Sequence, residues 1–119
     1  MNSARKEKLK RVHPGEILRE EFMKPLNLNM NKPATALRVS VTRIADIYHE
    51  RRGVTTDTAL RLARFLNTSA AFWVNLQRRH ELEIAEDREG GKINREVRRL
   101  TPRPEVTNKA KIEQQRPWL

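Results

Sequence analysis

Apolar positions recur at the spacing of an α-helix along most of the chain, from His13 to about Glu86. In this stretch they return every third or fourth residue, and the apolar-polar alternation of a half-buried strand is absent. The polar connections between the apolar stretches are short, so successive helices must pack closely against one another. The pattern therefore predicts an all-α fold, a compact domain of five helices.

Proline residues delimit the first helix. The stretch HPGE at His13 predicts a helix start, because proline suits the first helical position, where its missing N–H would have no partner. Glu16 then lies near the positive end of the helix dipole, and Pro25 is expected to end the helix. A second, short helix is expected between Asn29 and Leu37.

A third helix is expected in the stretch SVTRIADIYHERRG, which begins at Ser40. Ser40 is a favourable N-cap because its hydroxyl can accept a hydrogen bond from one of the first N–H groups of the helix. Ile44, Ile47 and Tyr48 share the side that faces the core. The other side is mainly polar and is expected to be free to contact a partner.

Two further helices follow. Thr55 or Thr56 is expected to cap a fourth helix, whose inward stripe consists of Ala59, Leu62, Ala63 and Leu66, with Arg61 and Arg64 pointing outward. Thr68 or Ser69 is expected to cap a fifth helix that runs toward Ile84.

The formal net charge of +10 is concentrated at the two ends of the chain. Residues 1–12 carry five basic and one acidic side chain, and residues 91–119 carry eight and three. The helical pattern decays from Gly90 onward. We therefore expect a basic arm over 1–12, a domain over 13–88 and a basic, flexible tail over 89–119. Such ends add salt-sensitive attraction to phosphates or serve only as solubilising termini.

Composition excludes several classes of function. The chain has no cysteine, which excludes disulfides, thiolate metal sites and cysteine nucleophiles. It has no apolar run long enough to span a membrane and no apolar segment behind its charged start, so we expect a cytoplasmic protein. Its three histidines, His13, His49 and His80, fall on separate helices. We therefore expect no enzyme activity, no cofactor and no metal site.

The second and third predicted helices, joined by a three- or four-residue turn, form a helix-turn-helix arrangement. The strings HPGEILREEF at His13, TTDTALRLARF at Thr55 and SAAFWVNLQ at Ser69 resemble the HigA (VapI-type) antitoxins of the Xre, or lambda-repressor-like, helix-turn-helix family. The resemblance spans about His13 to Glu86. It implies a five-helix lambda-repressor-like domain in a cytoplasmic bacterial protein. Such a protein forms a dimer, binds an operator in its own promoter and neutralises a HigB-type toxin, an mRNA-cleaving RNase of the RelE kind.

The third helix would then be the recognition helix. Arg43 is the strongest candidate for a base contact, because a guanidinium can donate two hydrogen bonds to guanine. Thr42 can contact a base edge, a phosphate or a thymine methyl, and Asp46 can accept a hydrogen bond from cytosine. In the alternative interpretation, Arg43 and Asp46 only pair with each other on a solvated helix surface.

Further polar residues are placed to contact phosphates, which sets the register on DNA without reading its sequence. They are Arg51 and Arg52 after the recognition helix, and Asn29, Asn31 and Lys32 at the start of the second helix. Each is equally compatible with an ordinary solvated side chain.

Several positions depart from the family pattern. Met30 and Pro33 stand where glutamine and leucine are common, and we expect the second helix to start near Lys32 with Pro33 in its first turn. Arg38 and Glu50 stand where the family often has glycine in left-handed turns, at a cost of roughly 1–2 kcal/mol each if that geometry is kept. These departures leave open whether specific DNA binding is retained.

Two partner surfaces are expected on the fifth helix. We assign Phe72 to the core, and Trp73, Leu76 and His80 to a stripe that meets a second copy in a homodimer. The dimer would set two recognition helices about 34–36 Å apart and so predicts a palindromic operator. The acidic residues Glu83, Glu86 and Asp87 would meet a basic toxin, or would form only a solvated helix end.

The alternative function is a protein-interaction module, for toxin or partner binding, whose helix-turn-helix has lost specific DNA binding. The repressor interpretation requires that Thr42 and Arg43 remain accessible while the apolar side of their helix is anchored to the domain.

Overall fold

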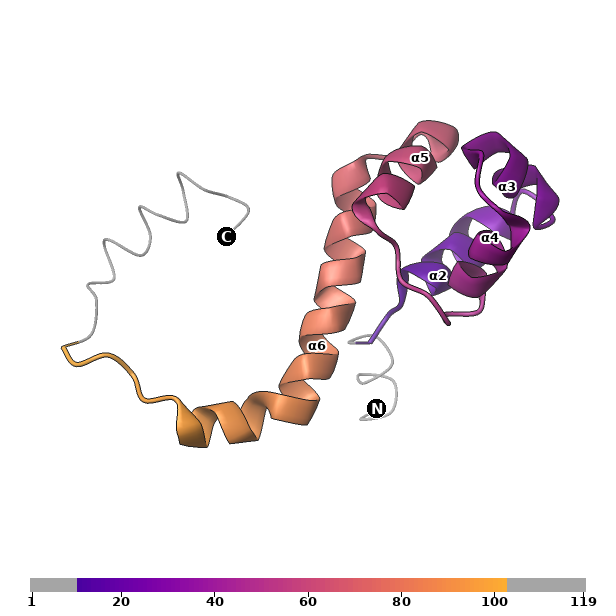
Figure 1. The fold of residues 1–119 in the computed structure, drawn as a ribbon. Helices are drawn as coiled ribbons and strands as arrows, with labels where there is room; N and C mark the ends of the chain where they lie inside the picture. The colour runs from indigo at the N-terminus through magenta and orange to yellow at the C-terminus, as the bar shows by residue number, and fades with distance from the viewer. Residues whose placement is uncertain (1–10, 103–119) are drawn as a thin grey trace. The chain divides into compact units, whose positions relative to one another are not determined.

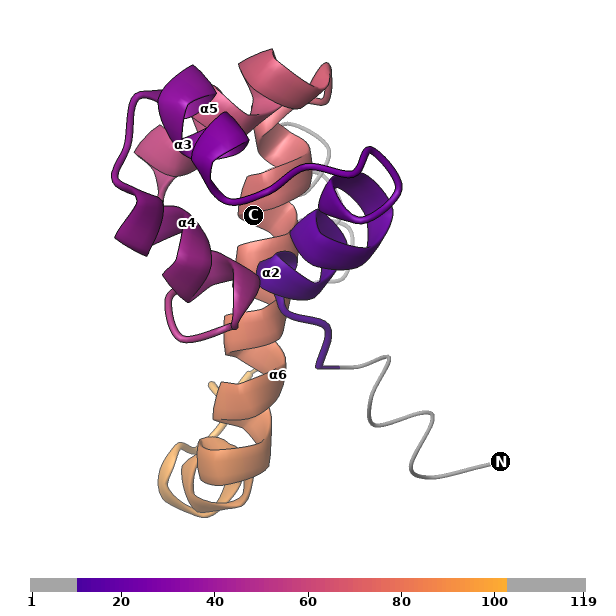
Figure 2. The same cartoon turned by 90° about the vertical axis from the view of Figure 1, so that its right-hand side faces the viewer.

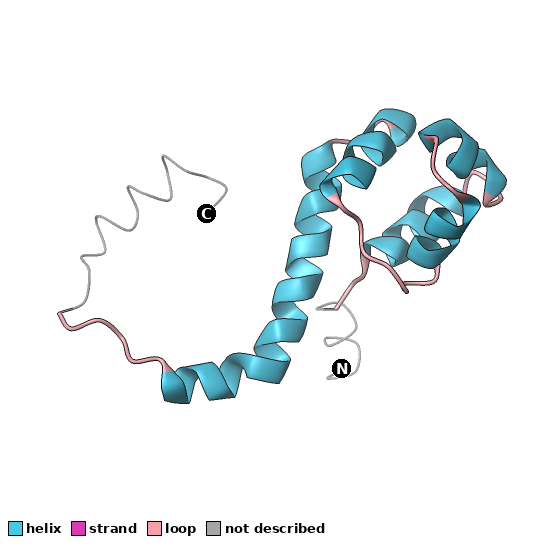
Figure 3. Ribbon diagram, in the orientation of Figure 1, coloured by secondary structure: helices cyan, strands magenta, loops and turns pink. Residues whose placement is uncertain are grey.

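The structure of the protein is a computed structural model, which describes residues 11–102. In chain order the elements are α2 (Pro14–Ile17), η1 (Leu18–Met23), α3 (Asn31–Leu37), α4 (Val41–Tyr48), α5 (Thr56–Leu66) and α6 (Ala70–Glu96) (Figure 1). Residues 11–102 form helices, turns and loops but no strand (Figure 3). The predicted all-α fold is confirmed. The arm expected over 1–12 lies almost entirely outside the described residues, and the expected tail is described only as far as Pro102.

The N-terminal caps explain where the helices begin. The Ser40 hydroxyl accepts a hydrogen bond from the Arg43 N–H at 3.0 Å, as predicted. Of the two threonines considered for α5, Thr55 is the cap, and Ser69 supplies the side-chain bond at the start of α6. His13 caps α2, because its Nδ1 accepts a hydrogen bond from the Gly15 N–H at 2.8 Å.

The first helix changes its winding partway along. After α2 the chain continues as η1, a π-helix, in which the Lys24 N–H donates to the Arg19 carbonyl at 2.9 Å. This longer hydrogen-bonded loop is the feature that defines π-type winding. The element ends at Met23, just before Pro25, so the predicted end is confirmed.

Helix α3 accommodates its proline as expected. The Asn29 side chain accepts a hydrogen bond from the Lys32 N–H at 3.0 Å, and the helix starts at Asn31. Pro33 is buried in the first turn, where the missing N–H removes no regular helical hydrogen bond. The prediction that the helix starts late is therefore confirmed, to within one residue.

The core lies where α2, η1, α3, α4 and α5 meet the first part of α6, an arrangement that Figure 2 shows from the side. It consists of Leu18, Met23, Ala34, Leu37, Ile44, Ile47, Val54, Ala59, Leu62 and Trp73. Gln77 of α6 also accepts a hydrogen bond from the Val54 N–H at 2.8 Å. A Cβ on Gly53 would lie only 2.7 Å from the Gln77 amide, so any larger residue before Val54 would make this side chain shift.

The two neighbouring aromatic residues of α6 differ in burial from the prediction. Trp73 is fully buried and donates its indole N–H to the Thr68 hydroxyl at 2.8 Å. Phe72, assigned to the core from the sequence, is 39% exposed. The prediction of Trp73 as a dimer contact is wrong, because its side chain is enclosed by its own chain and is closed to a partner.

Helix α6 also extends further than expected. The fifth helix was expected to run toward Ile84, with the pattern decaying from Gly90 onward and only Ile93, Val97 and Leu100 spaced for a further short helix, but α6 continues without a break to Glu96. Every residue from 91 to 100 is exposed, so this extension packs against no core. Within the described residues the chain divides into two units, between Arg88 and Glu89. None of the helices within residues 11–102 has the length and apolar character needed to cross a bilayer.

Candidate nucleic-acid interface

Helix α4 is anchored by its apolar side and exposes its first turn. Ile44 and Ile47 are fully buried, as predicted. Thr42 is exposed, and the Arg43 side chain keeps 36% of its surface exposed. The two strongest base-contact candidates are therefore accessible on a helix that the core holds in place.

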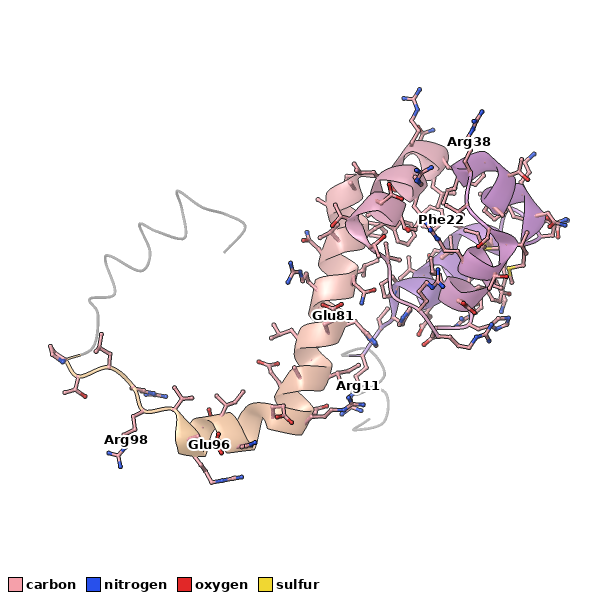
Figure 4. All side chains as sticks on the ribbon, viewed as in Figure 1. Arg11, Phe22, Arg38, Glu81, Glu96 and Arg98 are labelled. Atoms are coloured by element: carbon pink, nitrogen blue, oxygen red, sulfur yellow. The ribbon has the colours of Figure 1, made fainter. Side chains whose placement is uncertain are left out.

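The turn between α3 and α4 is left-handed at a non-glycine residue. Arg38 has φ 59° and ψ 46°, a conformation that costs an L-residue roughly 1–2 kcal/mol. The Val39 N–H then returns to the Ala34 carbonyl at 3.0 Å, which closes the end of α3. Arg38 is exposed, and Figure 4 shows its side chain pointing away from the helices. The left-handed geometry considered for this position is confirmed.

The end of α4 is fixed by Arg19 of η1. One guanidinium nitrogen donates to the Tyr48 carbonyl at 2.6 Å and another to the Glu50 carboxylate at 3.0 Å. Glu50 itself is left-handed, with φ 62°. Burial acts most strongly on the pKa of Arg19, in the downward direction, but hydrogen bonds to Glu20 and Glu50 outweigh it and raise the pKa.

The start of α2 approaches the end of α4 closely enough to require glycine. A Cβ placed on Gly15 would lie 1.8 Å from the Ile47 carbonyl oxygen. His13, which caps α2 beside this contact, meets the ring of His80 edge-on at 4.8 Å between centroids. Burial, followed by the nearby charge of His80, lowers the pKa of His13.

A carboxylate on α5 links α4 to its neighbours. Asp57 Oδ2 lies 3.8 Å from Nη1 of Arg43 and accepts a hydrogen bond from Nε of Arg61 at 2.8 Å. Arg61 also donates through Nη1 to the Leu37 carbonyl at 2.8 Å. Arg61 is exposed, as predicted, but it also satisfies a carbonyl at the end of α3 that has no partner within the helix.

Three of the predicted DNA contacts engage one another. Arg51 donates to the Asp46 carboxylate at 3.1 Å, and Arg52 lies 3.8 Å from it. The alternative pairing of Arg43 with Asp46 is not found, because each has a different partner. Asn29, Asn31 and Lys32 are exposed at the start of α3, where Asn29 already accepts the Lys32 N–H.

The predicted partner residues on α6 differ in accessibility. Leu76 packs partly against the core, and His80 is half-buried with an Nδ1 that has no hydrogen-bond partner. Glu83 is only 12% exposed and bonds to Arg79, while Asp87 pairs with Arg11. Glu86 is exposed. No cluster of three or more metal-binding side chains occurs within residues 11–102.

Sequence reasoning missed three residues that position α4. They are Gly15, Arg19 and Asp57. Gly15 lies within the HPGE motif, and the motif itself was a signal that a glycine was needed there. Arg19 and Asp57 carried no such signal, because their partners lie 29 and 14 residues away along the chain.

Comparison with known proteins identifies the family, although no protein-family profile matches the chain. Virulence-associated protein I of Dichelobacter nodosus is 48% identical over 83 residues, which are 70% of this chain and 77% of the relative. The antitoxin HigA of Pseudomonas aeruginosa, solved with the higBA promoter, is 42% identical, with a TM-score of 0.74. The match covers 76% of this chain and 98% of that one.

The chain belongs to the HigA (VapI-type) antitoxin family. A second solved structure of the HigA fold, antitoxin GraA in complex with its operator, is 44% identical to this chain. Its TM-score is 0.73, and the match covers 76% of this chain and 91% of GraA. Both neighbours were solved with DNA, and the HigA fold of this chain presents an accessible first turn of α4.

Proposed function

We propose that this HigA-family chain is a cytoplasmic, DNA-binding antitoxin that represses its own operon and neutralises a RelE-like, mRNA-cleaving toxin. The observation that carries the DNA-binding part is the exposed pair Thr42 and Arg43 on a helix anchored by Ile44 and Ile47. The similarity to HigA solved with its promoter supports the same conclusion. We assign base contacts to Thr42 and Arg43, with Asp46 a third contact if DNA displaces its arginine partners.

The proposed phosphate contacts are Asn29, Asn31, Lys32, Arg51 and Arg52. Arg51 and Arg52 can turn from Asp46 to phosphate because exposed ion pairs are worth only about 0–1 kcal/mol. Neutralised phosphates release counterions, so affinity must fall as salt rises. Arg51→Gln is therefore expected to weaken binding to all duplexes, whereas Arg43→Ala is expected to weaken binding mainly to the operator.

The test is a binding titration of the full chain with its own promoter fragment and with a random duplex of equal length, at several salt concentrations. The proposal expects a preference for the promoter that Arg43→Ala reduces by about ten- to a hundredfold. Equal binding to both duplexes that disappears as the salt concentration rises would contradict the proposal. That result would favour the alternative function, a partner-binding module without operator recognition, for which the pairing of Asp46 with Arg51 and Arg52 is the supporting observation.

We further propose a homodimer formed through α6 and a palindromic operator. Leu76 and His80 remain candidates, and the exposed Phe72 takes the place of Trp73. Light scattering should show a dimer in the wild-type chain and a monomer in Phe72→Asp. A monomeric wild-type chain at micromolar concentration would contradict the dimer.

For the toxin we propose contacts by Glu83, Glu86 and Asp87 with a basic HigB-type partner. Glu86 is the most accessible of the three, because Glu83 and Asp87 bond to arginines of their own chain. The test is binding of the protein encoded beside this gene, compared between wild type and Glu86→Lys. Unchanged affinity in the variant would exclude this surface.

A further inference from the structure

The carboxylate of Asp57 occupies a position from which it can control the direction of Arg43. Asp57 lies in the first turn of α5, and a single oxygen, Oδ2, faces two guanidinium groups. It accepts a hydrogen bond from Arg61 at 2.8 Å and lies 3.8 Å from Nη1 of Arg43. Arg43 belongs to α4, so this oxygen joins the recognition helix to α5.

The position of Asp57 is itself fixed from a third element. Arg61, four residues along α5, donates to the Leu37 carbonyl at the end of α3 at 2.8 Å. Leu37 is buried in the core, so Arg61 connects the Asp57 carboxylate to a fixed backbone carbonyl. Asp57 is thus held on the side of α5 from which it can attract the longer Arg43 side chain.

Exposure indicates that the Arg43–Asp57 pair serves orientation more than stability. The Arg43 side chain is 36% exposed and that of Asp57 is 59% exposed, and ion pairs of this kind contribute little to folding. A guanine contact, in contrast, requires the guanidinium plane to be aligned with two acceptor atoms. Holding a flexible side chain in advance lowers the ordering cost when DNA binds.

We propose that Asp57 is a positioning residue that orients Arg43 for base recognition. The inference rests on the proposed DNA-binding function. It has a distinctive consequence, because a carboxylate beside phosphates repels every duplex equally. Removing the charge of Asp57 should therefore raise the affinity for random DNA while it lowers discrimination at the base pair that Arg43 contacts.

A double-mutant cycle tests this consequence with Asp57→Asn and Arg43→Ala. The base pair contacted by Arg43 is first located as the promoter position at which Arg43→Ala reduces discrimination most without abolishing it. Asp57→Asn should reduce discrimination at that base pair by about three- to tenfold and should tighten binding to a random duplex. In the Arg43→Ala background the same change should leave discrimination unaltered. An equal loss in both backgrounds, or none in either, would overturn the proposal.

A measurement on the free protein separates this inference from the proposed function. Side-chain NMR of the Arg43 Nε–H should show an ordered group in wild type and a mobile one in Asp57→Asn. Asp46→Asn is the matched control, because Asp46 pairs with Arg51 and Arg52 and not with Arg43. If Arg43 is equally mobile with and without Asp57, the positioning role is wrong. If Asp57 orders Arg43 but the wild-type chain shows no promoter preference, the DNA-binding proposal fails, and with it the role of this ordering in base recognition.

Discussion

Arg19 holds the end of α4 through Tyr48: its guanidinium donates to the Tyr48 backbone carbonyl at 2.6 Å and lies 5.6 Å from the centre of the Tyr48 ring. The carbonyl belongs to the last turn of α4 and has no partner within the helix. Arg19 therefore joins η1 to α4 at a point that no helical hydrogen bond secures.

Replacing Arg19 with methionine should remove this link while keeping most of the apolar stem. Because a hydrogen bond to a charged group contributes about 1.5–3 kcal/mol, Arg19→Met should lower the free energy of unfolding by about that amount in urea denaturation. Glu20→Gln is the control, since Glu20 bonds to Arg19 from the exposed side, and it should change stability much less than Arg19→Met does. Equal stability of Arg19→Met and wild type would show that the contact is not formed in solution.

Two glycine-to-alanine changes should have opposite effects on the free energy of unfolding. At Gly15 a Cβ would lie 1.8 Å from the Ile47 carbonyl oxygen, so α2 must move away from α4. The free energy of unfolding should fall by about 1–3 kcal/mol or more, as it does when a core is overpacked. At Gly90 a Cβ would meet no atom within 4 Å, so alanine should stabilise the helix by about 0.5–1 kcal/mol. Thermal unfolding of the two variants measures both effects. A Gly15→Ala protein as stable as wild type would contradict the close approach.

Relief of the left-handed turn should stabilise the domain. Arg38→Gly removes a strain of roughly 1–2 kcal/mol, offset in part by the greater freedom of glycine in the unfolded chain. The net gain should be up to about 1 kcal/mol in chemical denaturation. The Glu50→Gly variant should gain less stability, because the substitution also removes the carboxylate that accepts a hydrogen bond from Arg19. A destabilised Arg38→Gly variant would mean that the Arg38 side chain makes a stabilising contact.

Stability should decline in mild acid because of His13. Burial lowers its pKa in the folded protein below 6.5, with a smaller contribution from His80, so the unfolded chain binds the proton more readily. The stability that the neutral His13 side chain contributes to the folded protein is fully present above about pH 6.5. It is lost as the pH falls from there through the lower pKa of the folded state. His13→Asn keeps a side chain that caps helices well, so it should flatten this part of the urea-denaturation pH profile. An unchanged slope would assign the effect to another group.

Much of the domain followed from local rules. Ser40 and Thr55 cap their helices, and Pro33 occupies the first turn of α3, as steric and hydrogen-bonding rules require. Ile44 and Ile47 face the core because their spacing places them on one side of α4. These features depend on residues within about two turns of one another, and such relations are visible in a sequence.

The errors share a different physical cause. Phe72 and Trp73 are adjacent aromatic residues on one helix, and periodicity alone assigns either to the core. Trp73 is the buried one because Thr68 accepts its indole N–H and Phe22 packs beside its ring at 5.6 Å. The unbroken continuation of α6 past Gly90 was not predicted, because helix propensity is a weak prior and the helically spaced Ile93, Val97 and Leu100 are exposed and pack against no core.

The sequence by itself determined the helical class, the helix starts, the family and the accessible face of α4, because these depend on short-range spacing and on motifs. Only the tertiary structure decided how α4 is held. Arg19 on Tyr48, Gly15 against Ile47 and Asp57 beside Arg43 each join groups far apart along the chain. Such pairs come together only when the hydrophobic core brings the helices into contact, and no local pattern encodes the directions in which their side chains then point.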